Sequence, residues 1–216
     1  MIKFTLDKKS NEVVNVLCLG AHSDDIEIGC GGTILRLIEE FPGSTFHWVV
    51  FSAIGVRKAE AQRAAESFAG SRLACLLLKE FRDGFMPFAG SEVKATFEEL
   101  KQAVSPDLIL THNRNDAHQD HRLLADLTWN TFRNHLILEY EIPKYDGDLG
   151  QPSVYVPLKT ELCQAKIGHL MDGFQSQHGK HWFEESTFRA LMRLRGMECN
   201  SPSGCAEAFY CRKLLL

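Results

Sequence analysis

One stretch near the amino terminus, residues 13–37, most constrains how this chain folds. It opens with VVNVLCL, a mostly apolar run with β-branched residues, which predicts a strand buried on both faces of a parallel sheet. Gly20 ends the run, and the polar segment AHSDD follows at once. The glycines of GCGG then lead into residues 33–40, whose apolar spacing predicts a helix. Side chains that follow a buried strand lie where α/β sheets place their chemistry.

Apolar runs alternate with helical patterns over the first 135 residues or so. Further strands are predicted at residues 46–52, 73–78 and 108–111, and helices at residues 56–68, 92–104 and 122–134. Later strands are predicted at 136–142 and 153–156, and helices at 160–174 and 182–195. This alternation is typical of a parallel sheet with helices on both faces. We therefore predict an α/β fold, Rossmann-like and doubly wound, with a mostly parallel sheet.

Length and composition limit the possible classes of protein. A chain of 216 residues is long enough for one sizeable core and short for two, so we expect a single domain over residues 1–216. The formal net charge of −4 argues against a protein that binds nucleic acid by neutralising phosphates. No apolar run approaches the roughly 20 residues that span a bilayer, so we expect no direct membrane insertion.

Two further features bear on the compartment. The segment MIKFTLDKKSNEVV has no apolar core of signal-peptide length, so a cytoplasmic location is expected. The seven cysteines are odd in number and form no CxxC pair, which indicates reduced thiols. The evenly spaced Cys199, Cys205 and Cys211 are not expected to bind metal, because structural zinc sites normally use closer pairs.

A second polar segment, HNRNDAHQDH at residues 112–121, directly follows the strand predicted at 108–111. The carboxyl ends of parallel strands meet at one edge of a sheet, so both polar segments should lie together. His22, Asp25 and His121 are suitable residue types for a zinc site with one open position. His118 lies three residues before His121, so at a helix start the two share a face.

Each segment alone has a simpler explanation. His-x-Asp-Asp in a loop is usually a solvated turn whose aspartate caps the next helix, and Asp120 could act as such a cap. The glycines of GCGG could indicate dinucleotide binding, but their spacing is not G-x-G-x-x-G. Two adjacent aspartates would also repel a pyrophosphate. The occurrence of both polar segments after predicted strands favours the metal site.

The combined pattern resembles a known family. AHSDD followed by GCGG, with HNRNDAHQDH about ninety residues later, is similar to the LmbE-like (PIG-L) family of zinc-dependent N-acetyl-sugar deacetylases. The resemblance extends over nearly the whole chain. Its further matches are the R-x-x-E pair Arg57 and Glu60, the turn FRDGF, Ser176-Gln177, and residues 206–209. Ser23 and Gln119 stand where the family often has proline, which affects loop rigidity more than chemistry.

The resemblance implies a role for each polar residue. The zinc ligands would be His22, Asp25 and His121. Asp24 would be the general base that deprotonates the water bound to zinc, and His118 would stabilise the oxyanion and protonate the leaving amine. Asp120 would orient a histidine from outside the metal's own ligands. A site of two histidines and one aspartate also accepts iron(II), cobalt or manganese, so zinc is one of several candidate divalent metals.

Two arginines are candidates for substrate binding. Arg57 and Arg114 lie near the predicted site, where each could hold a hydroxyl, a carboxylate or a phosphate of the substrate. For Arg57, a helix-surface ion pair with Glu60 is an equally good interpretation.

The predicted function is the removal of an N-acetyl group from an amino sugar or small glycoconjugate by water activated on zinc. Two alternatives stay open. One is an amidase that cleaves a thiol-sugar conjugate, and the other is a catalytically silent sugar-binding domain of the same fold. A protein that only binds sugar has no need for all of the candidate catalytic side chains, which argues against the catalytically silent domain. The expected partner is the small N-acetylated substrate, and self-association into a homo-oligomer stays open.

Overall fold

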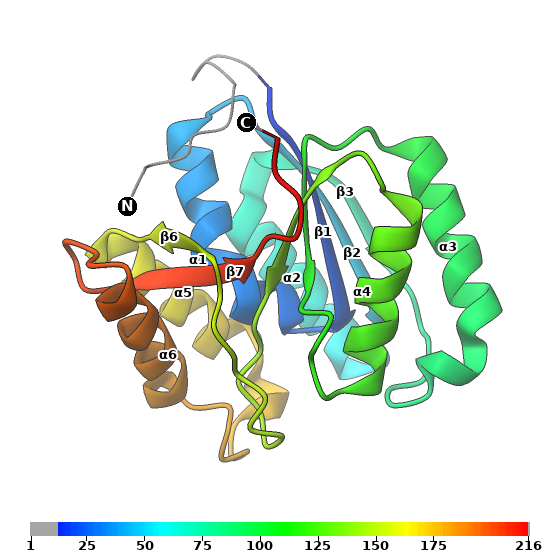
Figure 1. Cartoon of the computed structure of the whole chain (residues 1–216). Helices are drawn as coiled ribbons and strands as arrows, with labels where there is room; N and C mark the ends of the chain where they lie inside the picture. The colour runs from blue at the N-terminus through cyan, green and yellow to red at the C-terminus, as the bar shows by residue number, and fades with distance from the viewer. Residues whose placement is uncertain (1–12, 216) are drawn as a thin grey trace.

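This computed structural model describes residues 13–215 of the chain. A seven-stranded sheet forms the centre of the molecule (Figure 1). Its strand order is β3-β2-β1-β4-β5-β7-β6. The strands are β1 (Asn15–His22), β2 (Thr45–Ser52), β3 (Leu73–Leu78), β4 (Leu108–His112), β5 (Leu136–Tyr140), β6 (Val154–Pro157) and β7 (Ala206–Tyr210). Neighbouring strands from β3 to β5 pair in parallel, whereas β7 pairs antiparallel with both β5 and β6.

Helices pack on both faces of this sheet (Figure 1). One face is covered by α1 (Asp25–Glu40), α2 (Val56–Ala69), α5 (Thr160–Gly173) and α6 (Glu185–Glu198). The other face is covered by α3 (Gly90–Ala103) and α4 (Gln119–Thr131). Short 3₁₀ turns lie at Gly70–Arg72, Met86–Ala89 and Gln175–Gln177. The predicted α/β fold with a mostly parallel sheet is thereby confirmed.

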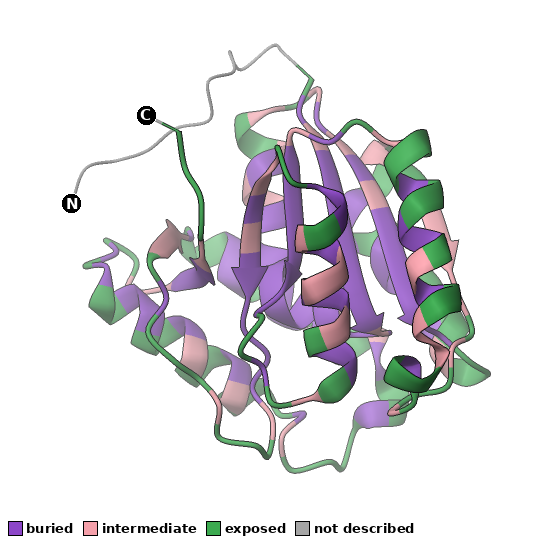
Figure 2. Ribbon diagram, turned by 45° about the vertical axis from the view of Figure 1, so that its right-hand side comes forward, coloured by how far each residue is buried: buried purple, intermediate pink, exposed green. Residues whose placement is uncertain are grey.

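The core consists of two layers, one on each side of the sheet. In β1, Val16 and Cys18 face the layer under α1 and α5, whereas Leu17 and Leu19 face the layer under α3 and α4. All of them are fully buried, which explains why β1 has an unbroken apolar run. Figure 2 shows the central strands buried along most of their length, with exposed residues on the outer faces of the helices.

Helix α1 begins at Asp25, eight residues before the predicted start at Thr33, so the glycine-rich segment is itself helical. Glycine is unfavourable inside helices, but here its small size is required. A Cβ atom on Gly29 would lie 2.2 Å from Cδ2 of Tyr140 in β5, and one on Gly32 would lie 2.4 Å from Cδ1 of Leu158. The glycines therefore allow α1 to pack closely against its neighbours.

Strand β7 has no counterpart in the sequence prediction. Its second residue, Glu207, is buried, and a charged residue disrupts the apolar pattern by which buried strands are predicted. The structure satisfies this charge locally. Glu207 accepts hydrogen bonds from the backbone N–H groups of Gly32 and Thr33 at 2.8 and 2.6 Å, and from Lys166 Nζ at 2.6 Å. The buried ion pair thus joins β7 to α1 and α5.

Within residues 13–215, no helix combines the length and the apolar character that crossing a membrane requires.

The close packing of α1 gives a first prediction. Replacing Gly29→Ala should destabilise the protein by about 1–3 kcal/mol, because the added methyl group overlaps the Tyr140 ring. Gly168→Ala is the matched control, since Gly168 lies in α5 with nothing within 4 Å of its Cβ position. That change should stabilise the protein by about 0.5–1 kcal/mol. Urea denaturation measures both free energies of unfolding, and equal effects would contradict the packing argument.

Candidate metal centre

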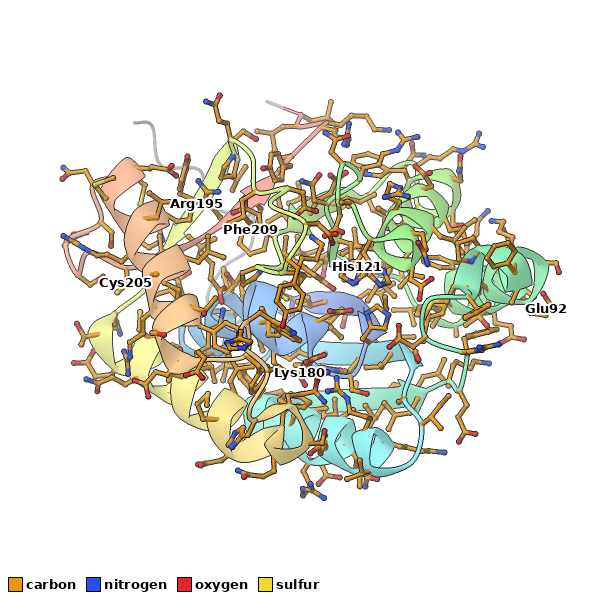
Figure 3. The ribbon with its side chains drawn as sticks, turned by 90° about the horizontal axis from the view of Figure 1, so that it is seen from below. Glu92, His121, Lys180, Arg195, Cys205 and Phe209 are labelled. Atoms are coloured by element: carbon orange, nitrogen blue, oxygen red, sulfur yellow. The ribbon has the colours of Figure 1, made fainter. Side chains whose placement is uncertain are left out.

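The two polar segments meet at the carboxyl edge of the sheet. Strands β1 and β4 are hydrogen-bonded neighbours that run in parallel, and they end at His22 and His112. Helix α1 begins at Asp25, directly after β1, and α4 begins at Gln119, after a short loop that follows β4. Figure 3 looks onto this edge and places His121, from the first turn of α4, near its middle.

Three of the predicted ligand atoms converge on one point. His22 Nδ1 lies 3.1 Å from His121 Nε2 and 3.3 Å from Asp25 Oδ2, and His121 Nε2 lies 3.5 Å from the same Asp25 oxygen. Ligands arranged tetrahedrally around zinc, with bonds of about 2.0–2.1 Å, are separated by about 3.3 Å. The spacing of these atoms therefore fits a small divalent ion bound by two histidines and one aspartate.

Carboxylates fix the tautomer of both histidines. His22 Nε2 lies 3.0 Å from Asp83 Oδ1 and 3.3 Å from Asp120 Oδ2, and His121 Nδ1 lies 3.0 Å from Asp116 Oδ2. Because carboxylates accept hydrogen bonds, Nε2 of His22 carries its proton. His121 Nδ1 lies at ion-pair distance from Asp116 without the alignment of a hydrogen bond, and the nearby carboxylate favours a proton on that nitrogen. The lone pairs of His22 Nδ1 and His121 Nε2 are then free for a metal, an arrangement common around metal-bound histidines.

The charges of the cluster also suit a cation. Burial raises the pKa of Asp25, but His121, His112 and His22 outweigh this effect and hold that pKa well below its ordinary value. Asp25 is therefore ionised although it is buried. Burial and the neighbouring His112 lower the pKa of His121 to about 4, so His121 is neutral at pH 7. Burial lowers the pKa of His22, but Asp25, Asp120 and Asp83 outweigh this effect and raise that pKa well above its ordinary value, so a metal ion would displace a proton from this ring. Neutral imidazole and ionised carboxylate are the forms that bind metal.

Asp24 has one paired and one free oxygen. Its Oδ1 accepts a hydrogen bond from Arg57 Nη2 at 2.6 Å, while its buried Oδ2 has no hydrogen-bond partner among the described residues. Burial raises the pKa of this carboxyl even though Arg57 acts against that shift. Glu60, the other partner considered for Arg57, instead accepts hydrogen bonds from the backbone N–H and the hydroxyl of Ser176, at 2.8 and 2.6 Å.

His118 lies at the start of α4, beside both candidate histidine ligands. Its ring centroid is 4.8 Å from that of His22 and 4.6 Å from that of His121. Its Nδ1 accepts the Asp120 N–H at 3.2 Å, so the proton of the neutral ring is on Nε2. Burial and the neighbouring His22 lower the pKa of His118, which favours this neutral form.

Asp120 binds the loop at residues 83–86, which lies beside the site. Its carboxylate accepts the backbone N–H groups of Gly84 and Met86 at 2.7 and 3.2 Å. This loop also carries Asp83, whose carboxylate contacts His22. Asp120 thereby holds the second carboxylate near His22, in addition to its own contact with that ring.

Arg114 is placed differently from the other candidates. Its guanidinium pairs with Asp126 on α4, both side chains are almost half exposed, and its backbone N–H donates to Glu139 at 3.0 Å. No contact in the described part of the chain joins this guanidinium to the metal-ligand candidates. Its substrate-binding role stays a prediction, and the observed contacts favour a surface ion pair.

His112 and Asp83 contact the candidate ligands but were not singled out as site residues from the sequence. His112 is fully buried at the end of β4, and its Nε2 lies 3.2 Å from Asp25 Oδ2. His112 is the first residue of the segment HNRNDAHQDH. Because it ends a strand, the sequence pattern did not indicate that it contacts α1. Asp25, His112 and His121 place ligand-type atoms within 4.8 Å of one another.

Comparison with known proteins identifies related sequences and folds. The family model PIG-L, described as GlcNAc-PI de-N-acetylase, matches residues 17–132, which is more than half of the chain. This match contains both polar segments, so the resemblance noted from the sequence is confirmed. No curated protein matches the chain.

Several solved structures share the fold at low sequence identity. The N,N'-diacetylchitobiose deacetylase from Pyrococcus horikoshii is 19% identical with a TM-score of 0.76, covering 97% of this chain and 87% of its own. GalB, the 4-carboxy-2-hydroxymuconate hydratase from Pseudomonas putida KT2440, is 17% identical with a TM-score of 0.75, covering 94% and 98%. The zinc-inhibited form of the teicoplanin deacetylase Orf2 is 13% identical with a TM-score of 0.70, covering 92% and 97%.

The converging ligand atoms predict how two neighbouring aspartates differ. Asp25→Ala should abolish tight zinc binding, because it removes the ionised ligand. Asp24→Asn should still bind one zinc ion per chain, because Oδ1 of Asp24 pairs with Arg57 and its Oδ2 is not among the converging atoms. Metal analysis after dialysis and competition with a chelator measure both outcomes. Zinc retention by the Asp25→Ala protein would contradict the proposed ligand set.

Proposed function

This chain belongs to the PIG-L family, and on that premise we propose that it is a metal-dependent deacetylase that removes an N-acetyl group from an amino sugar or small glycoconjugate. One observation carries the proposal. Three ligand atoms from His22, Asp25 and His121 converge at the spacing of a zinc site. Beside them, Asp24 is placed to take a proton and His118 to donate a hydrogen bond.

His22, Asp25 and His121 would hold the ion. Two neutral imidazoles and one carboxylate suit zinc, and they also accept iron(II), cobalt or manganese. An ion bound there would polarise an amide carbonyl and lower the pKa of water to about 7. Asp83, Asp116 and Asp120 orient the two histidines through their other ring nitrogens.

Asp24 is the proposed general base. Amide hydrolysis requires that the attacking water lose a proton as it bonds to the carbonyl carbon. Among the described residues, Oδ2 of Asp24 has no hydrogen-bond partner, and burial raises the pKa of this carboxyl, which makes it a stronger base. Arg57 holds the other oxygen, so it fixes the direction in which Oδ2 points.

His118 is the proposed hydrogen-bond partner of the substrate carbonyl. Its Nε2–H can donate a hydrogen bond to the carbonyl oxygen as negative charge develops there. As the C–N bond breaks, the proton that Asp24 has taken from the water can pass to the amine nitrogen, because a neutral His118 that gave up its own Nε2 proton would be left as an imidazolate. The hydrogen bond from Asp120 N–H to His118 Nδ1 keeps the proton on Nε2.

Two lines of support favour an N-acetylated sugar as the substrate. The matching family is described as a GlcNAc-PI de-N-acetylase, and two structural relatives are named as deacetylases. GalB shows that a hydratase shares this fold, so the fold alone does not select the reaction. Asp24 beside the site favours hydrolysis, because a departing amine needs a proton and Asp24 can return the one it takes from the water.

The assay for this proposal is acetate release from a panel of N-acetylated sugars, nucleotide sugars and thiol-sugar conjugates. Release should stop when a chelator removes the metal and return when zinc is added. Asp24→Asn should lower kcat by about 10²–10⁴-fold while the protein keeps its metal.

Glu99→Gln is the matched control, an equivalent carboxyl-to-amide change on the exposed surface of α3, and its activity should equal that of the wild type. Full turnover by the Asp24→Asn protein would overturn the assignment of the general base. A metal-loaded wild type that releases no acetate from any member of the panel would contradict the proposed reaction.

A further inference from the structure

We propose that His112 is a positioning residue that fixes the geometry of two proposed metal ligands, Asp25 and His121. It would do so without binding the ion itself. The inference rests on the metal site proposed above, and it assigns a role to a buried residue that this site does not use. His112 contacts one ligand through a ring nitrogen and the other through the face of its ring.

The ring nitrogen lies where β1 meets the first turn of α1. His112 Nε2 accepts the backbone N–H of Ala21 at 3.0 Å and lies 3.2 Å from Asp25 Oδ2. Ala21 directly precedes His22, so one atom of His112 contacts the backbone beside one candidate ligand and the carboxylate of another. Because the lone pair of Nε2 accepts the Ala21 N–H, this nitrogen donates no hydrogen bond to Asp25. It limits the positions of Asp25 Oδ2 as a close neighbour on one side.

The face of the same ring supports His121. The two imidazoles stack with their centroids 3.9 Å apart and an angle of 19° between their planes. A metal bond requires the lone pair of Nε2, which lies in the plane of the His121 ring. Stacking on His112 fixes that plane, and the contact of His121 Nδ1 with Asp116 at 3.0 Å fixes the rotation within it.

A buried column supports His112 from the other side. The hydroxyl of Tyr140 lies 3.3 Å from His112 Nε2 and donates to the carbonyl oxygen of Leu19 at 2.6 Å. The centroids of the Tyr140 and His112 rings are 4.8 Å apart. The Tyr140 ring also packs against Gly29, so closely that a Cβ atom on Gly29 would overlap the ring. The column from Gly29 to His121 is buried, so His112 has little freedom to move.

His112 is a poor candidate for a ligand in its own right. Its Nε2 lone pair already accepts the Ala21 N–H, and ligation through this atom would leave that buried N–H without its acceptor. Its Nδ1 is buried and has no hydrogen-bond partner among the described residues, but it is not the atom that faces Asp25. The geometry therefore assigns His112 to positioning.

Two substitutions separate the two contacts. His112→Phe keeps a flat ring that can stack on His121 but removes the nitrogen near Asp25, and His112→Gln keeps a polar group but removes the stack. Each variant should bind zinc about 10–100-fold more weakly than the wild type, as measured by competition with a chelator of known affinity. The visible spectrum of the cobalt(II)-loaded proteins, which reports coordination geometry, should change as well.

Thr111→Val is the matched control. Thr111 precedes His112 in β4, is fully buried, and its hydroxyl lies 3.2 Å from that of Thr128 in α4. This change loosens the packing between β4 and the helix that carries His121 but touches no candidate ligand. The zinc affinity of the Thr111→Val protein should stay within about twofold of the wild type. If His112 only filled space in the core, the His112 variants would also keep their zinc affinity.

The outcomes separate this inference from the proposed function. If the wild type binds zinc and the two folded His112 variants bind it equally well, with unchanged cobalt spectra, the inference is overturned and the proposed function stands. If the wild type itself binds no zinc, the metal site and the inference both fail. Circular dichroism of the metal-free variants shows whether each is folded. Weakened binding by either folded variant, together with a normal Thr111→Val protein, supports the inference.

Discussion

The site depends on the buried carboxylate of Asp25. This group accepts the His22 backbone N–H at 2.6 Å, and one of its oxygens lies within 3.5 Å of ring nitrogens from His22, His112 and His121. A buried negative charge is costly unless it is paired, so the carboxylate draws the two polar segments together. Its place in the first turn of α1 adds the favourable end of the helix dipole.

The position of Asp25 depends in turn on how closely α1 packs. Gly29 faces Tyr140, Gly32 faces Leu158, and Glu207 accepts hydrogen bonds from the backbone of the same helix. Each contact joins α1 to an element distant in the sequence. Fold and chemistry are therefore coupled, because a shift of α1 away from the sheet would move Asp25 away from the histidines of β4 and α4.

The sequence was sufficient to predict the central part of the fold. The strand at residues 73–78 has the predicted bounds, and α2 ends one residue beyond its predicted end. These elements are determined by local patterns of apolar residues. Helix α1 and strand β7 depend on distant contacts instead. Glycines are favourable in α1 because Tyr140 and Leu158 leave no space for a Cβ. Glu207 is tolerated in β7 because Lys166 and the backbone N–H groups of α1 satisfy its charge.

The candidate site shows the same limit. The meeting of His22, Asp25 and His121 was predictable, because parallel strands bring their carboxyl ends to one edge. Three contacts required the three-dimensional arrangement: the pairing of Arg57 with Asp24, the surface pairing of Arg114 with Asp126, and the stacking of His112 on His121. A side chain at a strand end can face either helix layer, so sequence alone did not indicate that His112 contacts α1.

The most direct test of this account is to locate the metal in crystals of the zinc-loaded protein by anomalous diffraction at the zinc absorption edge. The account predicts one strong peak about 2.0–2.2 Å from His22 Nδ1, His121 Nε2 and an oxygen of Asp25, with His112 stacked on His121 and not bound to the ion. A peak bound by His112 in place of His22, or one held by His118, Asp83 and Asp120 with Asp25 unbound, would contradict it.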